Sequence, residues 1–210
     1  MPRSARPATV PSFTIEDEVA GPVCGVDEAG RGPLAGPVVA AAVILNRNIV
    51  PEGIGDSKAL TAAQREKVFR EILSVADVSF AFASAREIDR LNIRRATLLA
   101  MRRAVAALPV PPATVLIDGR DVPPGLVQPA RAVIGGDALS LSIGAASIVA
   151  KVMRDRAMQR LEAQDARYGF GRHMGYPTVE HRRAIEHHGP SPHHRMTFGP
   201  LKDWPGPSRR

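Results

Sequence analysis

The stretch Gly25-Val26-Asp27-Glu28-Ala29-Gly30-Arg31-Gly32-Pro33-Leu34-Ala35-Gly36-Pro37 combines features that a hydrophobic core does not use. Two adjacent carboxylates end an apolar run, and each raises the pKa of the other unless a cation lies between them. An arginine between two glycines follows, and such a turn can offer its N–H groups and its guanidinium to one anion. The simplest interpretation is a divalent metal held by Asp27 and Glu28 beside a phosphate held by the Gly-Arg-Gly turn.

The composition predicts one globular domain with a basic surface. A chain of 210 residues can bury one substantial core but is short for two. Apolar residues at 44% and charged residues at 23% argue against general disorder. The net charge of +7 favours a polyanionic partner such as nucleic acid, although solubility alone would also explain it. Aromatic residues at 4% are too few for a platform that stacks many single-stranded bases.

Cysteine usage and hydropathy indicate a cytoplasmic protein. Cys24 is the single cysteine, which excludes a disulfide framework and a cysteine zinc site and fits a reducing compartment. The longest apolar run, 34–45, is interrupted by Gly36 and Pro37, so no membrane span is expected. Residues 1–20 lack a secretory apolar segment and are predicted to be a flexible tail. A single domain over 21–200 and a C-terminal tail over 201–210 complete the division.

Hydrophobic periodicity predicts an α/β fold. Short strands are expected at 23–27, 38–45, 78–83, 114–118 and 130–134, the first two forming a hairpin with the second in the interior of the sheet. One helix is expected after Thr61, because Val68, Phe69, Ile72 and Leu73 are spaced for one apolar face. A long amphipathic helix is expected over 85–108. Two more are expected after Ser140 and over 178–188.

Two further acids, Asp118 and Asp137, each follow an apolar segment and precede a turn. Ligands gather where strands of α/β sheets end, although Asp118 could instead begin an Asx turn before Gly119. Four acids at one sheet edge demand cations, and hard oxygen ligands select Mg²⁺ or Mn²⁺. With no lysine-bearing P-loop, two-metal phosphodiester hydrolysis is the natural chemistry, with ions about 4 Å apart. Because neighbouring strand residues point to opposite faces, Glu28 must then lie in the turn.

The C-terminal part contains all six histidines and also Tyr176, which is one of only two tyrosines in the chain. The histidines predict a basic, partly titratable surface facing phosphate rather than zinc, because arginines are interleaved and no cysteine is near. Tyr176, on a Gly-Tyr-Pro loop, is either a packing plug or a stacking surface for a sugar or base. Asp155 lies between Arg154 and Arg156 in a helix, which indicates a structural ion pair. The histidines are His173, His181, His187, His188, His193 and His194.

Several motifs together resemble bacterial ribonuclease HII, the type 2 ribonuclease H, over residues 23–198. The opening stretch and the Ala-Ala-Ser-Ile-Val-Ala-Lys block are the most specific of them. The others are Asp56-Ser57-Lys58, Asn92-Ile93 before Ala96-Thr97, Ile117-Asp118-Gly119, Gly136-Asp137, Arg154-Asp155, Gly175-Tyr176 and His194-Arg195 before Phe198.

The resemblance implies a ribonuclease H-like fold, a mixed central β-sheet flanked by helices with a helical C-terminal extension. It also implies an endonuclease that cleaves the RNA strand of RNA–DNA hybrids and incises 5′ of single ribonucleotides in duplex DNA. Residues 21–200 would form the catalytic domain. The expected partners are these two duplexes, and a monomer is expected.

The resemblance also assigns residues to roles. The metal-binding, catalytic acids would be Asp27, Glu28, Asp118 and Asp137, holding Mg²⁺ or Mn²⁺. The backbone of Gly30, Arg31 and Gly32 would sense the ribose 2′-OH, with Tyr176 stacked at the sugar. The flanking nucleic-acid backbone would be held by Lys58, Ser147, Lys151 and Arg195.

The chain departs from the family pattern at Gly135 and Met174, where lysines are common. Both changes remove a potential phosphate contact, so they bear on substrate affinity and salt sensitivity rather than on the metal site. Two alternatives remain at this point. One is a non-catalytic basic domain that binds duplexes, its acids serving as turn formers, and the other is a different two-metal nuclease on the same fold.

Overall fold

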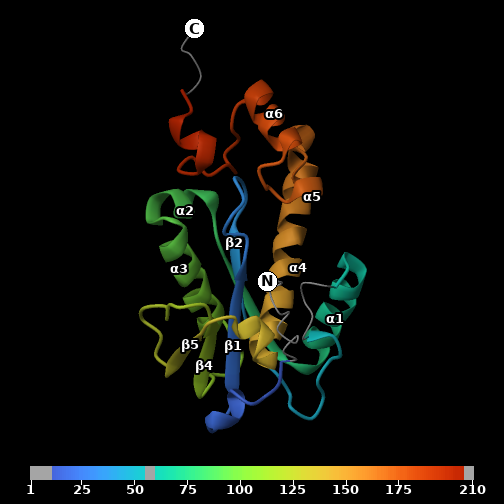
Figure 1. Cartoon of the computed structure of the whole chain (residues 1–210), viewed down its shortest axis with the longest axis vertical. Coiled ribbons are helices and arrows are strands. Elements are labelled where there is room, and N and C mark those ends of the chain that lie inside the picture. Colours follow the sequence, from blue (N-terminus) through green and yellow to red (C-terminus); the bar gives the residue numbers. More distant parts are fainter. Residues whose placement is uncertain (1–10, 55–59, 206–210) are drawn as a thin grey trace, which may run out of the picture.

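A five-stranded mixed sheet forms the centre of the molecule (Figure 1). The computed structural model describes residues 11–54 and 60–205. The spatial order is β3-β2-β1-β4-β5; β1, β2 and β3 are antiparallel neighbours, and β4 and β5 run parallel to β1. This arrangement confirms the predicted hairpin and the interior position of its second strand. The strands are β1 (Val23–Ala29), β2 (Val38–Ile44), β3 (Asp77–Ala83), β4 (Thr114–Asp118) and β5 (Ala130–Val133).

Helices cover both faces of the sheet. Figure 1 shows α2 and α3 on one side of β2, α4 on the other, and α5 and α6 at the far end of α4. The bounds are α1 (Ala62–Val75), α2 (Ala85–Leu91), α3 (Ile93–Ala106), α4 (Leu141–Gln164), α5 (Phe170–His173) and α6 (Val179–His188). Among the described helices, none is long and apolar enough to cross a bilayer. Short 3₁₀ turns are η1 (Glu16–Glu18), η3 (Gly136–Ala138), η4 (Ala166–Tyr168) and η5 (Gly199–Asp203).

Strand β1 is the axis of the packing. Its alternation sends Cys24 and Val26 into the core beneath α3, whereas Gly25 and Asp27 face α4. A Cβ atom at Gly25 would collide with the backbone at the start of α4, so glycine is required for the close approach of helix and strand. The small residues at the start of α4 contribute to the same contact.

The segment 85–108 is two helices rather than the single one expected from its periodicity. Asn92 interrupts it with φ 67°, and its side-chain oxygen accepts a hydrogen bond from the Arg95 N–H at 3.1 Å. Asparagine is a strong N-cap, so its side chain compensates for the break and begins the next helix. A smaller correction concerns Leu73, which is 47% exposed on α1 instead of buried with Val68 and Ile72.

The described ends of the chain are packed, so the two predicted tails are too long. Glu16 is buried, and its Oε1 accepts hydrogen bonds from Ser140 Oγ at 2.6 Å and Ser142 N at 3.0 Å at the start of α4. At the other end, Leu201 is 1% exposed and packs with Trp204 in an apolar cluster. Residues 11–20 and 201–205 therefore belong to the folded domain.

Candidate active site

Two acids meet where β1 and β4 run side by side. The parallel register pairs Val26 with Ile117, so Asp27 and Asp118 come next on adjacent strands. Strand β1 continues to Ala29, so the expectation that Glu28 already lies in the turn is wrong. The Glu28 carboxylate nevertheless interacts electrostatically with Asp118. Both residues lie just beyond Val26 and Ile117, the last paired residues of β1 and β4. Three of the four predicted acids are thus close together.

The electrostatics of this edge favour a bound cation. Asp27 is 6% exposed, and burial raises the pKa of its carboxyl well above the ordinary value, with Glu28 and Asp118 raising it further. Burial likewise raises the pKa of Glu28, although the Arg31 guanidinium, 3.3 Å away, opposes the change. A hydrogen bond from Ser147 favours the ionised form of Asp27. Divalent ions would compensate these buried negative charges.

The backbone of Gly136 brings the segment that carries the fourth acid next to β4. The Gly136 N–H donates to Asp118 Oδ1 at 2.7 Å, which places η3, and with it half-buried Asp137, beside β4. Within the described residues, no group of three or more side chains forms a ready-made metal cage. The oxygen-only donor set nevertheless fits Mg²⁺ or Mn²⁺ and not zinc.

The Gly30–Gly32 turn follows β1 directly, and its carbonyl oxygens face inward. Arg195 donates to the carbonyl oxygens of Gly30 at 2.6 Å and Arg31 at 2.9 Å. Among the described residues, the N–H groups of Arg31 and Gly32 donate to no protein acceptor. Gly30 has φ +97°, and a Cβ there would collide with the Arg154 side chain, so only glycine fits. The turn is therefore held through its carbonyl oxygens, and these two N–H groups take no part in holding it.

Two buried arginines hold the loop between β1 and β2, to which this turn belongs. Arg154 donates to the carbonyl oxygens of Ala35 and Pro37, and Arg195 also donates to that of Gly36. Arg195 is 0% exposed, so its expected direct contact with a flanking phosphate is wrong; it positions the turn instead. From the sequence alone, Arg154 is placed only in a family motif and next to an expected ion pair, because the carbonyl oxygens that it contacts lie far away in the chain.

The remaining residues assigned to the flanking backbone have different surroundings. Lys151 Nζ lies 2.7 Å from Asp155 Oδ1, so the partner of Asp155 is this lysine and not a neighbouring arginine. Lys58 lies outside the described residues. Of the two departures from the family pattern, Gly135 has φ +68°, which glycine adopts without strain, and Met174 has φ 50°.

Tyr176 lies beside the Gly30–Gly32 turn, although it is distant in sequence. Its side chain is 47% exposed, so the interpretation as a packing plug is wrong. A Cβ atom placed on Gly32 would lie 3.8 Å from Tyr176 Cε1. The Leu34 N–H donates to the Gly175 carbonyl oxygen at 2.9 Å, which ties the two segments together. An exposed aromatic ring thus borders the free N–H groups of the turn.

The histidines do not form the single basic surface that the sequence predicts. His181 and His194 are buried and contact each other, Nε2 to Nε2, at 3.0 Å. Burial lowers the pKa of both imidazoles, that of His194 to about 4. Only His187 and His188 are well exposed among the six. The buried pair is therefore neutral near pH 7 and does not serve as a cationic phosphate ligand.

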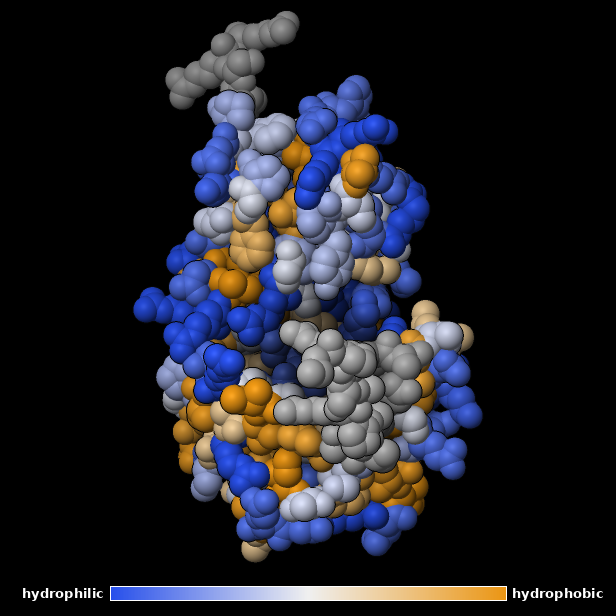
Figure 2. Space-filling model, in the orientation of Figure 1, coloured by the Kyte–Doolittle hydropathy of each residue, from blue (hydrophilic) through white to orange (hydrophobic). Residues whose placement is uncertain are grey.

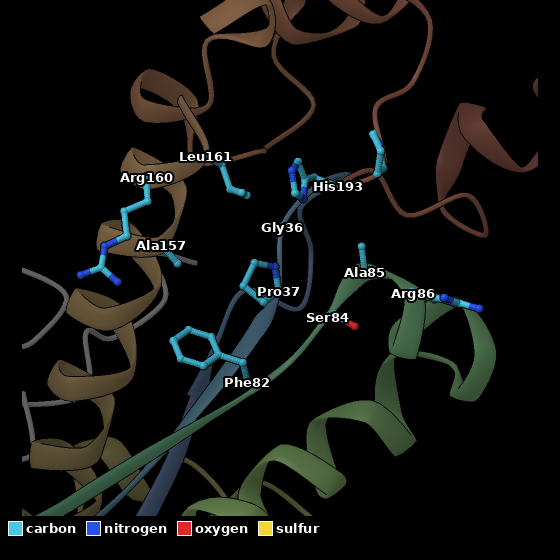
Figure 3. A pocket seen from close by; sticks show the side chains of 11 residues that line it. Gly36, Pro37, Phe82, Ser84, Ala85, Arg86, Ala157, Arg160, Leu161 and His193 are labelled. Atoms are coloured by element: carbon cyan, nitrogen blue, oxygen red, sulfur yellow. The ribbon is translucent and has the colours of Figure 1, made fainter. Parts of the chain in front are cut away.

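The surface offers two kinds of hollow. Figure 2 shows hydrophilic side chains around a depression at mid-height, below the C-terminal helices. A separate, mostly apolar pocket of about 360 Å³ lies between β3, α2 and α4, and none of the four acids lines it. In Figure 3 Pro37, Phe82, Leu161 and His193 gather around this pocket. Its lining carries no carboxylate, so this pocket is separate from the acids at the edge of β1 and β4.

Comparisons with solved structures identify the fold. The ribonuclease H2 of Pyrococcus horikoshii superposes with a TM-score of 0.71 at 28% identity, over 86% of this chain and 95% of that one. Bst-RNase HIII in complex with Mn²⁺ superposes with a TM-score of 0.71 at 18% identity, over 94% and 72% of the respective chains. These matches confirm the ribonuclease H-like fold with its mixed sheet and helical C-terminal region.

Sequence comparisons give the family. The sequence profile described as Ribonuclease HII matches residues 24–200. The ribonuclease HII of Sinorhizobium medicae is 60% identical over 181 residues, which are 86% of this chain and 84% of the relative. That of Rhizobium meliloti is 56% identical over 199 residues, or 93% and 92% of the two chains. The chain therefore belongs to the ribonuclease HII family of hydrolytic endoribonucleases.

Proposed function

We propose that this enzyme cleaves the RNA strand of RNA–DNA hybrids and incises 5′ of single ribonucleotides in duplex DNA, using two divalent metal ions. The observation that carries the proposal is the junction of the acids with the Gly30–Gly32 turn. Arg31 Nη1 lies 3.3 Å from Glu28 Oε1, so the ribose-sensing groups adjoin the buried carboxylates. Such adjacency would couple recognition of a sugar to hydrolysis of the neighbouring phosphodiester.

The acids would hold the metal ions. Asp27, Glu28, Asp118 and Asp137 would provide the oxygen ligands, and Mg²⁺ or Mn²⁺ would activate water and stabilise the leaving 3′ oxygen. Ser147, hydrogen-bonded to Asp27, would orient that carboxylate. The proton needed by the leaving oxygen would come from solvent.

The turn and Tyr176 would select the ribonucleotide. The 2′-OH is the group that distinguishes a ribonucleotide from its deoxy neighbours, so the selector must contact it. The N–H groups of Arg31 and Gly32 point away from the inward carbonyls that Arg195 holds. The exposed Tyr176 ring beside Gly32 would stack at the sugar of the junction. Lys151 would reach the flanking phosphates from α4, exchanging its contact with Asp155.

The decisive test uses a DNA duplex that contains one ribonucleotide, incubated with the protein and Mg²⁺ or Mn²⁺. We expect a single nick 5′ to the ribonucleotide and none in the matched all-DNA duplex. Cutting of both duplexes at equal rates would refute the 2′-OH assignment and favour another two-metal nuclease on this fold. Binding without any nick, in either metal, would favour the non-catalytic duplex-binding domain.

The oligomeric state and the cytoplasmic location are also proposals. We expect a monomer, which light scattering during size-exclusion chromatography would test. The single cysteine, Cys24, is buried and is 0% exposed, which is compatible with a reducing cytoplasm.

A further inference from the structure

A continuous chain of buried hydrogen bonds ends on the backbone of Tyr176. The Ser191 N–H donates to His194 Nδ1 at 2.9 Å, and His194 Nε2 lies 3.0 Å from His181 Nε2. His181 Nδ1 in turn lies 2.9 Å from the Tyr176 carbonyl oxygen. The two imidazoles are 2% and 0% exposed. They are too far inside the protein to contact a substrate, yet their chain leads to the exposed tyrosine.

One arrangement of protons satisfies every contact in this chain. His194 Nδ1 accepts from a backbone N–H, so the proton of His194 lies on Nε2. That N–H donates to His181 Nε2, which leaves the proton of His181 on Nδ1, where it donates to the Tyr176 carbonyl. A second proton on either ring would place two N–H groups against each other. The chain therefore requires both histidines to be neutral.

The Tyr176 carbonyl is an anchor for an otherwise exposed ring. Tyr176 follows Gly175, which has φ +76°, and the described residues provide no aromatic partner for its ring. The peptide is fixed by the His181 donation and by the bond from Thr178 N to the same oxygen at 2.8 Å. We propose that His181 and His194 are positioning residues that hold Tyr176 opposite the Gly30–Gly32 turn, and so set selectivity for a single ribonucleotide. This inference rests on the proposed role of Tyr176 at the sugar.

The surroundings keep the pair neutral. Aromatic rings enclose it: the Tyr168 ring centroid lies 4.8 Å from that of His194, and Phe170 contacts both imidazoles. The titratable and charged groups that face the pair are His173, stacked at 4.4 Å on His181, together with Glu180, His193 and Asp165. Desolvation is the largest influence on both rings and outweighs the two acids.

Two substitutions at His181 separate its two contacts. An asparagine amide reaches about as far as Nδ1 and a glutamine amide about as far as Nε2, so His181→Asn keeps the donor to Tyr176, whereas His181→Gln keeps the contact with His194. We expect His181→Gln to lower the rate of cleavage at a single ribonucleotide, relative to the rate on a long hybrid, by roughly tenfold. This is the effect of losing one hydrogen bond at the upper end of its usual range. His181→Asn should remain within about threefold of the wild type.

The matched control is His187→Gln, at an exposed position of the same helix, which should leave the ratio unchanged. In a Tyr176→Ala background, His181→Gln should cause no further change in the ratio, because the two substitutions would remove the same function. Equal losses on both substrates, or additive effects with Tyr176→Ala, would show that the histidines only maintain the fold and would overturn the inference.

A measurement independent of activity separates this inference from the proposed function. Nitrogen-15 NMR of the histidine-labelled wild type at pH 7 should show Nδ1–H on His181 and Nε2–H on His194. The opposite tautomers would overturn the inference even if the enzyme nicks as proposed. If the wild type fails to nick at single ribonucleotides, the proposed function fails, and the tautomers still decide whether the anchor exists.

Discussion

At the scale of single residues, the protein buries ionisable side chains, although burial makes their charged forms unfavourable. Asp27 has 6% of its surface exposed and faces two further carboxylates, so its ionised form is unfavourable in the free protein. Arg154 and Arg195 are equally enclosed, but every hydrogen bond they make goes to carbonyl oxygens of the loop between β1 and β2. At these positions the fold accepts a cost in stability that the proposed metal site would explain.

The substitution Asp27→Asn tests this conflict. Because the pKa of Asp27 is raised in the folded state, its contribution to stability is full below the ordinary aspartate value near 3.9 and is lost as pH rises. We therefore expect Asp27→Asn to raise the Tm at pH 7 without divalent ions by about 2–4 °C, the shift that 1 kcal/mol produces in a protein of this size. The gain should shrink towards pH 4.

The same variant should still bind the duplex but lose cleavage by at least about a hundredfold, since it removes a proposed metal ligand. Thermal unfolding across pH and a binding assay in EDTA provide the two measurements. A lower Tm at pH 7, or loss of binding without metal, would contradict the assignment of Asp27.

At the scale of elements, one residue decides where α2 ends and α3 begins. Asn92 has φ 67° and ψ 163°, a region that is nearly exclusive to glycine. Its side chain compensates by capping α3. The strong periodicity of 85–108 hides the break, because Ile88 and Leu91 before it and Met101 and Val105 after it all pack against the same core.

Substitutions of Asn92 separate backbone strain from capping. Asn92→Gly relieves the strain and loses only a few tenths of a kcal/mol as a cap, so its stability should equal or exceed that of the wild type. Asn92→Ala loses the cap and keeps the strain, and should cost about 0.5–2 kcal/mol. Urea unfolding would measure both. Equal stabilities for the two variants would show that the positive φ carries no strain.

At the scale of the whole molecule, the C-terminal region docks onto the turn that carries the site. The chain at 193–195 pairs with the segment at 34–36 through the bridge between Ala35 and His194, and the Gly36 N–H donates to the His193 carbonyl oxygen. Arg195 reaches the turn from the same segment. The C-terminal region, at one end of the molecule in Figure 1, therefore packs directly on the loop of the candidate site.

This docking makes stability sensitive to acid. Both His181 and His194 have pKa values in the folded state below the ordinary 6.5. As the pH drops below 6.5, the unfolded chain therefore binds protons that the folded chain does not bind. Stability should fall as pH drops from about 6.5 to about 4, with a slope of up to about 1.4 kcal/mol per pH unit for each histidine. The raised carboxyls of Asp27 and Glu28 act in the opposite direction.

A comparison of variants isolates the histidine contribution. Urea unfolding of His194→Asn, which keeps an acceptor for the Ser191 N–H, should show a shallower pH dependence than the wild type between pH 4.5 and 6.5. His187→Asn, at an exposed position, should follow the wild type. An unchanged slope in His194→Asn would indicate that the buried pair does not titrate as expected.

The strands, the acids at their ends and the family are all predictable from the sequence. These features are local: apolar runs, caps such as Thr61 and Ser140, and acids placed directly after strands carry their signal within a few residues. The same locality explains the errors. Residues 11–20 look like a tail because the contact of Glu16 with Ser140 is invisible in sequence, and Arg195 looks like a phosphate ligand because nothing nearby shows that it is enclosed.

The construction of the proposed ribose sensor becomes visible only in the folded chain. It places Tyr176 beside Gly32, directs two buried arginines at the intervening loop, and links two histidines into one hydrogen-bonded chain. Each of these contacts joins segments that are distant in the chain, and its existence depends on burial and on hydrogen-bond geometry. The opening stretch specifies the chemistry of the site, whereas packing against α4 and the C-terminal segment fixes its shape.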